Sequence, residues 1–300
     1  MERLKGLAMI IIGASLWGLS GPMMEWTLDN SGMSISFLLT VRLLVAGLII
    51  IAYLKLKGKK VMRPWRQKVW ARQMVIFGVL GMLGVQFAFT SAIAESNAVI
   101  ATLFQFLSPI YVILFVSLRQ KFVPPIAQIV GMAVTLGGLF LLLTNGSLSG
   151  FSLSASAVFW GIAVGFAFTF YTLYPVRLMQ EWGVLLSIGW AMVVGGAALF
   201  VTNFLKMFQE IPYLFDWKVA LMLLGIIIVG TVAFLLFLGS MNFISPIETS
   251  ILSSFEPLTA MIVSVAWLGA VLGVWQLAGA VTMLLGVTGI SVAGGRAKKE

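Results

Sequence analysis

Long apolar stretches, separated by short polar segments, constrain the fold of this chain more than any other feature. A helix needs about 20 apolar residues to cross roughly 30 Å of hydrocarbon, and stretches of that length recur throughout the sequence. The chain is 60% hydrophobic and 10% charged, whereas soluble domains carry about 25% charged residues. Its mean hydropathy is +1.06. We therefore predict an all-α polytopic membrane protein.

Breaks in the apolar pattern, marked by polar residues, Gly or Pro, divide the chain into ten candidate transmembrane helices. The predicted spans are residues 5–27, 33–54, 73–94, 97–118, 124–144, 153–175, 184–205, 218–240, 246–268 and 272–293. The last boundary has no polar loop, and Gly269 and Gly273 supply its turn signal.

The distribution of Lys and Arg predicts the orientation, because cytoplasmic loops collect these residues. With both termini in the cytoplasm, the inner segments hold sixteen Lys and Arg, and the outer loops hold two, Lys206 and Lys218. We expect a multi-pass protein of the cell membrane, in a bacterial inner or plasma membrane, with both termini cytoplasmic.

The basic segment KLKGKKVMRPWRQKVWARQ, residues 55–73, contains Trp65 and Trp70 among its cations. Such a pattern occurs in nucleic-acid-binding segments, but in a membrane protein it also suits a cytoplasmic loop on anionic headgroups with interfacial tryptophans. We predict the anionic bilayer surface as the partner, and no nucleic acid.

Two parts of the chain form a weak internal repeat. ATLFQFLSPIYVIL at 101–114 aligns with TSILSSFEPLTAMI at 249–262, which superposes Pro109 on Pro257 at an offset of 148 residues. Near the start of each half, SLWG at 15–18 aligns with VFWG at 158–161, at an offset of 143 residues. The repeat predicts two domains of five helices, residues 1–146 and 147–300.

Glycines extend this repeat. The same offset of 148 residues superposes Gly131 on Gly279 and Gly138 on Gly286. Small residues at such spacings let membrane helices pack closely. The glycine pairs that we assign to packing are Gly131/Gly138, Gly279/Gly286, Gly161/Gly165 and Gly269/Gly273.

An odd number of helices in each half reverses the membrane orientation of the second half. Inverted repeats are typical of secondary transporters, whose substrate site lies between the repeats and is lined by interrupted helices. Pro109 and Pro257 each remove a backbone donor, so we expect them to interrupt their helices and face a central cavity. A plain packing kink is the alternative.

The sequence resembles the EamA-type, ten-helix members of the drug/metabolite transporter superfamily. The resemblance rests on Trp-Gly in the first helix of each half, TVRLLVAG in the second helix, and the repeated prolines. It implies two inverted five-helix repeats and export of amino acids, metabolites or drugs. Two family features are missing: the Gly-Glu before the fifth and tenth helices, where QKF and LGAV stand, and the first-helix carboxylate of the four-helix relatives.

Two ionisable residues lie deep within predicted spans, where a charge costs at least ~2.5–3.5 kcal/mol and suggests a function. Glu256 is about 15 Å from the cytoplasmic start of its helix, and Arg42 is about 13 Å from the outer start of its own. They form either a structural ion pair or the two ends of a binding site for a zwitterion such as an amino acid. Glu256 also makes the proton a candidate coupling ion.

Other polar and aromatic residues within spans could contact a small organic solute, although each could equally serve helix packing. The candidate substrate-binding residues beside Glu256 and Arg42 are Gln105, Ser108, Ser253, Trp17, Trp160 and Tyr111, with Gln86, Asn242 and Tyr171 as further polar groups.

A secondary transporter that exports small organic solutes by alternating access is the predicted function. No GxxxxGK[ST] stretch is present to couple ATP directly. An intramembrane enzyme is one alternative, but the chain has no His or Cys to build a triad or metal cluster. A membrane scaffold or receptor is the other. No cofactor or metal is expected.

Overall fold

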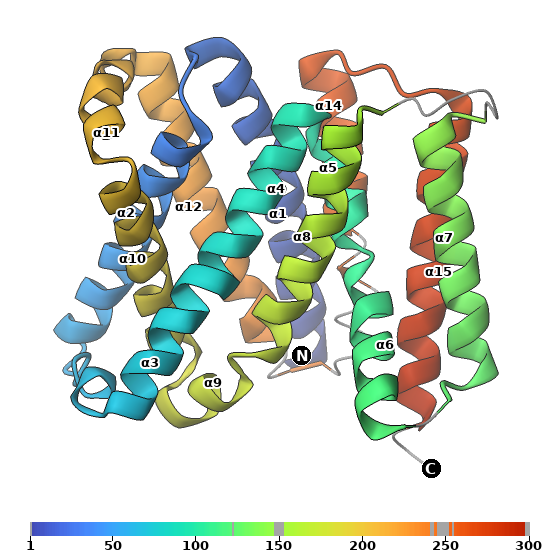
Figure 1. Ribbon diagram of the computed structural model, residues 1–300, viewed down its shortest axis with the longest axis horizontal. Coiled ribbons are helices and arrows are strands. Elements are labelled where there is room, and N and C mark those ends of the chain that lie inside the picture. Colours follow the sequence, from blue (N-terminus) through green and yellow to red (C-terminus); the bar gives the residue numbers. More distant parts are fainter. Residues whose placement is uncertain are drawn as a thin grey trace. The chain divides into compact units, whose positions relative to one another are not determined.

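The computed structural model describes residues 2–121, 123–146, 153–240, 243–244, 252–253 and 255–297. Within these residues every regular element is helical and no β-strand occurs (Figure 1). This confirms the predicted all-α class.

The helices follow the predicted spans closely. Their bounds are α1 (Glu2–Ser31), α2 (Ile35–Leu56), η1 (Pro64–Arg66), α3 (Lys68–Ile76), η2 (Phe77–Leu83), α4 (Gly84–Glu95), α5 (Ala98–Gln105), α6 (Ser108–Gln120), α7 (Ile126–Thr144), α8 (Ala155–Leu173), α9 (Val176–Trp182), α10 (Val184–Thr202), α11 (Phe204–Glu210), η3 (Ile211–Phe215), α12 (Trp217–Ser240), α14 (Phe255–Leu268) and α15 (Val274–Ala297). Residues 246–251 and 254 of the ninth predicted span lie outside the described residues.

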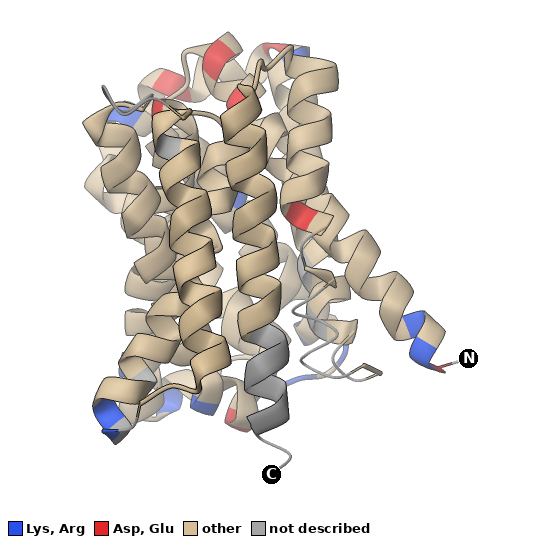
Figure 2. Cartoon of the chain, turned by 90° about the vertical axis from the view of Figure 1, so that its right-hand side faces the viewer, with Lys and Arg blue, Asp and Glu red and all other residues tan. Residues whose placement is uncertain are grey.

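Some of these helices, alone or joined end to end with the next helix, are long and apolar enough to cross a membrane. Among the described residues, seven helical segments are long and apolar enough to span it, and the other three apolar helices are shorter: Ile126–Leu142, Phe255–Leu268 and Val274–Ile290. In Figure 2 most charged residues lie near helix ends, as transmembrane helices require.

The chain forms two compact units. Unit 1 comprises Met1–Glu25, Ala92–Gly165 and Val229–Glu300, and unit 2 comprises Trp26–Ser91 and Phe166–Ile228. The chain passes between them within α1, α4, α8 and α12.

In unit 1, α7 and α15 lie side by side over their length (Figure 1). A Cβ built on Gly131 would lie 3.1 Å from the carbonyl oxygen of Gly286, and one on Gly138 would lie 2.6 Å from that of Gly279. Residue numbers rise along one helix as they fall along the other, so the two helices are antiparallel. These four glycines therefore serve the close packing predicted for them, and the repeat-related helices run in opposite directions.

Unit 2 is organised around a similar antiparallel pair, α2 and α10. A Cβ on Gly47 would lie 2.9 Å from the carbonyl oxygen of Gly189, and one on Gly196 would lie 2.8 Å from Leu44. A third segment, η2, packs against α10 as a seven-residue π-helix, with Gly78 against Val194. Helix packing through small residues therefore recurs in both units.

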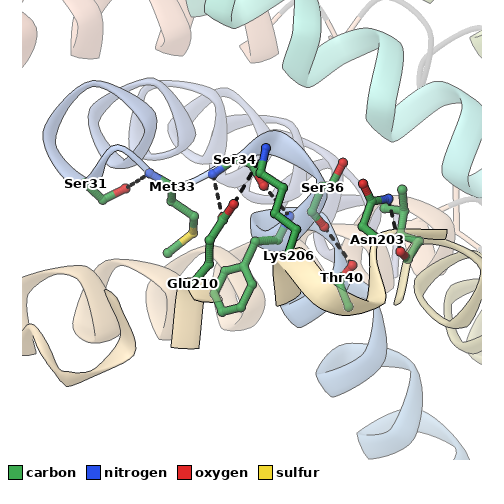
Figure 3. Close-up of polar contacts among 10 residues, drawn as sticks. Ser31, Met33, Ser34, Ser36, Thr40, Asn203, Lys206 and Glu210 are labelled. Carbon is green, nitrogen blue, oxygen red and sulfur yellow. Dashed lines mark hydrogen bonds and ion pairs between the residues drawn. The ribbon is translucent and has the colours of Figure 1, made fainter. Parts of the chain in front are cut away.

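The start of α2 is fixed by a residue from a distant part of unit 2. The backbone N–H of Ser34, the residue before α2, donates a 2.8 Å hydrogen bond to Glu210 Oε2 of α11 (Figure 3). Glu210 is 6% exposed, and its other carboxylate oxygen lies 3.9 Å from Lys206 Nζ. A carboxylate suits this position because the first N–H groups of a helix lack partners within it.

Two sequence expectations need correction. Gly269 and Gly273 lie in the connection between α14 and α15, where Gly269 has φ +68° and a Cβ built on it would meet nothing within 4 Å. They form the predicted turn, and the predicted helix packing of this pair is wrong because neither is helical. The basic segment 55–73 is also not a loop throughout, since α3 begins at Lys68.

Candidate functional site

Gln105 and Glu256 meet inside unit 1. Gln105 Nε2 donates a hydrogen bond of 3.2 Å to Glu256 Oε1, and the two residues are 9% and 7% exposed. Gln105 is the last residue of α5, and Glu256 lies in the first turn of α14. Two helices that pack together therefore bring an amide donor against a buried carboxylate.

This meeting point lies where the fourth predicted span is interrupted. α5 ends at Gln105, a turn follows at residues 106 and 107, and α6 begins at Ser108 with Pro109 in its first turn. A proline is accommodated there because the first turn has no intrahelical partner for its missing N–H. The break between α5 and α6 lies at residues 106 and 107 and precedes the proline.

The ninth span has a related arrangement. Pro257 is buried in the first turn of α14, and the Glu256 N–H donates to the carbonyl oxygen of Ser253 at 2.9 Å. Ser253 is half-buried, and its repeat partner is Gln105, while the repeat partner of Glu256 is the buried Ser108. The two polar pairs are therefore related by the same offset of 148 residues that relates the prolines.

α1 covers one side of the α14 start. A Cβ on Gly18 would clash with the Glu256 carbonyl oxygen and lie 3.1 Å from the Ala260 nitrogen. The half-buried Trp17 packs on Phe237 with ring centroids 4.7 Å apart. The glycine of the first Trp-Gly therefore has a packing role: because Gly18 has no side chain, the backbone at Glu256 can lie close against α1.

The second Trp-Gly acts similarly on the other interrupted helix. A Cβ on Gly161 of α8 would lie 2.5 Å from the Phe104 ring, and one on Gly165 would lie 2.6 Å from the Tyr111 ring. Both glycines therefore serve the close packing predicted for them. Trp160 is half-buried and meets Phe159 edge to face, with ring centroids 5.2 Å apart.

Arg42 belongs to unit 2, where it is 8% exposed. Its Nη1 donates a 3.1 Å hydrogen bond to Gln86 Oε1 of α4. The other predicted polar residue of this unit, Tyr171, stacks on Phe77 at 5.7 Å. The pairing of Arg42 with Glu256 stays a prediction, since the two residues belong to different units.

Three features of the structure were not expected from the sequence. They are the η2 π-helix, the Ser34–Glu210 hydrogen bond, and a 2.7 Å hydrogen bond from the Ala98 N–H at the start of α5 to Glu25 Oε2. The segment FGVLGMLG, residues 77–84, contains three glycines, but this composition does not specify a π-helix. Asn242 lies outside the described residues.

Comparison with known proteins identifies the class. The chain matches the EamA-like transporter family over residues 4–144 and 155–292, and it belongs to that family. It is therefore a multi-pass membrane transporter and not an enzyme.

One relative is a curated bacterial protein. The chain is 36% identical over 266 residues to the uncharacterized inner membrane transporter YicL of Salmonella typhimurium strain LT2, covering 88% of each protein. A solved structure described only as "Crystal structure of protein" is also similar, with a TM-score of 0.64, 19% identity, and coverage of 98% of this chain and 99% of that one. At this identity the second likeness supports the fold alone.

Proposed function

We propose that the protein is a secondary transporter that exports small organic solutes, amino acids or related metabolites, by alternating access. The observation that carries this proposal is the buried Glu256 carboxylate beside Gln105, at the interrupted ends of two apolar helices. A carboxylate so placed costs several kcal/mol in a membrane and is rarely kept without a function. Its partner, a neutral amide, offsets that cost only in part.

In this proposal the site binds a solute through complementary polar groups. Glu256 pairs with a cationic group such as an ammonium, and Gln105, Ser108 and Ser253 contribute hydrogen bonds. Arg42, held by Gln86, receives the carboxylate end of a zwitterion, which corresponds to the predicted ion pair with the solute inserted. Trp17, Trp160 and Tyr111 provide apolar and aromatic contacts.

The proposal extends to topology and coupling. The two repeats, residues 1–146 and 147–300, have opposite membrane orientations and enclose a central cavity that Pro109 and Pro257 face. Both termini are cytoplasmic. A proton is the proposed coupling ion because Glu256 can release one on one side of the membrane and bind one on the other.

Transport in proteoliposomes tests this function. Vesicles containing the purified protein are loaded with a mixture of amino acids and related metabolites, and efflux is followed with and without a pH gradient. We expect efflux of one solute class, accelerated by the gradient and lost in Glu256→Gln, which keeps the shape of the side chain but can neither bind a cation nor exchange a proton. Efflux by Glu256→Gln at the normal rate and with the same pH dependence would contradict the role of Glu256.

A further inference from the structure

A basic groove lies at the end of α2, in unit 2. The chain turns after Leu56 at Gly58, which has φ +74°. The groove has a volume of about 790 Å³ and is lined by Lys55, Lys59, Lys60, Val61, Met62, Arg63, Arg66 and Gln67. Five of these described residues are cationic and none is acidic. A groove of this charge attracts anions.

The backbone around the groove is fixed by contacts with α10. Trp190 Nε1 donates a 2.8 Å hydrogen bond to the Val61 carbonyl oxygen, and Trp65 meets Trp190 edge to face at 5.2 Å between centroids. Val61 and Pro64 are buried. A ligand entering this groove therefore does not have to order the loop, and preorganisation of this kind favours binding.

The cations themselves stay accessible. Lys59, Lys60, Arg63 and Arg66 are all exposed, and the repulsion between neighbouring like charges is relieved when an anion lies among them. Lys provides a point charge for a phosphate, and Arg can donate two parallel hydrogen bonds to one.

Exposed apolar side chains occur in the groove and next to its lining residues in the sequence. Met62, which lines the groove, is 54% exposed. Leu56, which follows Lys55, is 88% exposed, and Val69, two residues after Gln67, is 66% exposed. Apolar residues beside cations at the end of a transmembrane helix suit the boundary between headgroups and acyl chains. A free phosphate ion would gain nothing from them, whereas a phospholipid would bury them.

The tryptophans of the segment argue against nucleic acid. Trp65 packs on Trp190, and Trp70 meets Trp182 edge to face with centroids 6.0 Å apart. Single-stranded nucleic acids are bound by aromatic rings whose faces are free to stack on bases. The Trp65 ring is engaged in fixing the loop to α10, and the Trp70 ring joins α3 to α9.

We propose that this groove is a binding site for the headgroup of an anionic phospholipid, with the phosphate among Lys59, Lys60, Arg63 and Arg66 and the acyl chains beside Leu56 and Met62. The site would fix the α2–α3 connection to one leaflet. It is separate from the proposed solute site, and its test requires no transport.

Native mass spectrometry of the full-length protein in detergent tests the proposal, with phosphatidylglycerol and phosphatidylcholine as probes. The test variant is K59Q/K60Q/R63Q/R66Q, and the matched control, with the same number of charges removed elsewhere, is R119Q/K121Q/K206Q/K218Q. We expect wild type and control to retain phosphatidylglycerol over phosphatidylcholine, and the test variant to lose at least about tenfold in affinity, because each basic residue near an anionic surface contributes roughly fivefold.

Equal loss in the control, or unchanged binding by the test variant, would overturn the proposal. Displacement of the lipid by an equal concentration of inorganic phosphate would also overturn it, since the ligand would then be a free anion. The melting temperature of each variant is measured in parallel. If the fourfold variant melts early, K59Q/K60Q alone is compared with K206Q/K218Q, and a loss of less than about twofold relative to that control would count against the site.

Discussion

Gly138 and Gly279 approach each other so closely that a Cβ built on either would lie 2.6 Å from the carbonyl oxygen of the other. The contact is reciprocal, as expected where two repeat-related helices meet across an approximate two-fold axis. Gly131 and Gly286 make the corresponding contact further along the same helices. α7 and α15 are thus held together by backbone contact, which side chains at these positions would prevent.

Substituting these glycines should destabilise unit 1. We expect Gly138→Val or Gly279→Val to lower the free energy of unfolding by about 1–3 kcal/mol or more, because the added atoms meet backbone that cannot move aside. Thermal melting of the purified protein in detergent measures the effect.

The same two helices provide controls. Gly137 of α7 and Gly289 of α15 are exposed, and a Cβ on either would meet nothing within 4 Å. Gly137→Val and Gly289→Val should therefore leave the melting temperature nearly unchanged. Equal destabilisation at all four positions would show that glycine content, and not close approach, stabilises the helix pair.

Gln105 and Glu256 should be energetically coupled. Gln105→Met keeps the side-chain length but removes the donor to Glu256, so we expect a loss of about 1–3 kcal/mol in stability. The loss should be smaller in a Glu256→Gln background, giving a coupling energy of about 0.5–3 kcal/mol in a double-mutant cycle. Gln128→Met in α7, a half-buried glutamine of unit 1, serves as the control. Strict additivity would argue against the hydrogen bond.

Glu210 should matter more to unit 2 than Lys206. Glu210→Leu leaves the Ser34 N–H without its acceptor, and we expect a loss of about 1–3 kcal/mol, whereas Glu210→Gln keeps an acceptor and should cost less. Lys206→Met should cost under about 1 kcal/mol, because the Lys206 side chain is 58% exposed and its pair with Glu210 is 3.9 Å long. Denaturation of the three variants gives the order, and a larger effect at Lys206 would contradict this account of Figure 3.

The topology predicted from Lys and Arg can be measured directly. Reporter fusions after Lys60 and Lys299 should be cytoplasmic, and a fusion after Ser147 should be external, because positively charged segments stay on the cytoplasmic side. Each position is fused to two reporters, one active only in the cytoplasm and one active only outside, so that the inactive reporter is the control for the active one. External activity after Lys60 would reverse the orientation of the whole chain.

The helices could be predicted from the sequence because each is defined by its own composition. Apolar length defines the spans, and prolines and glycines repeated at one offset predicted the α5/α6 interruption and the antiparallel α7 and α15. Gly269 and Gly273 show the limit of the method, because the same spacing occurs in a helix interface and in a turn. The π-helix at Phe77–Leu83 depends on a backbone register that composition does not define.

The sequence predicted which residues belong to the site but not all of the contacts between them. Gln105 and Glu256 were both candidates because polar groups inside apolar spans stand out. Their hydrogen bond joins positions 151 residues apart, and the Ser34–Glu210 bond joins positions 176 apart. Such pairings depend on how helices pack in three dimensions, and a single sequence carries little trace of that packing.

The double variant Arg42→Met, Glu256→Met distinguishes a binding role from a structural ion pair. If the two charges only neutralise each other, removing one leaves the other unpaired and costs about 3–5 kcal/mol, while removing both restores stability and transport together. If they bind the solute, the double variant should fold, since Met fills similar volume, but should lose transport by at least about tenfold. Melting temperature and efflux from proteoliposomes are measured on both single variants and the double. Full transport by a stable double variant would leave Glu256 and Arg42 as structural residues, and the solute site would then have to lie elsewhere in the protein.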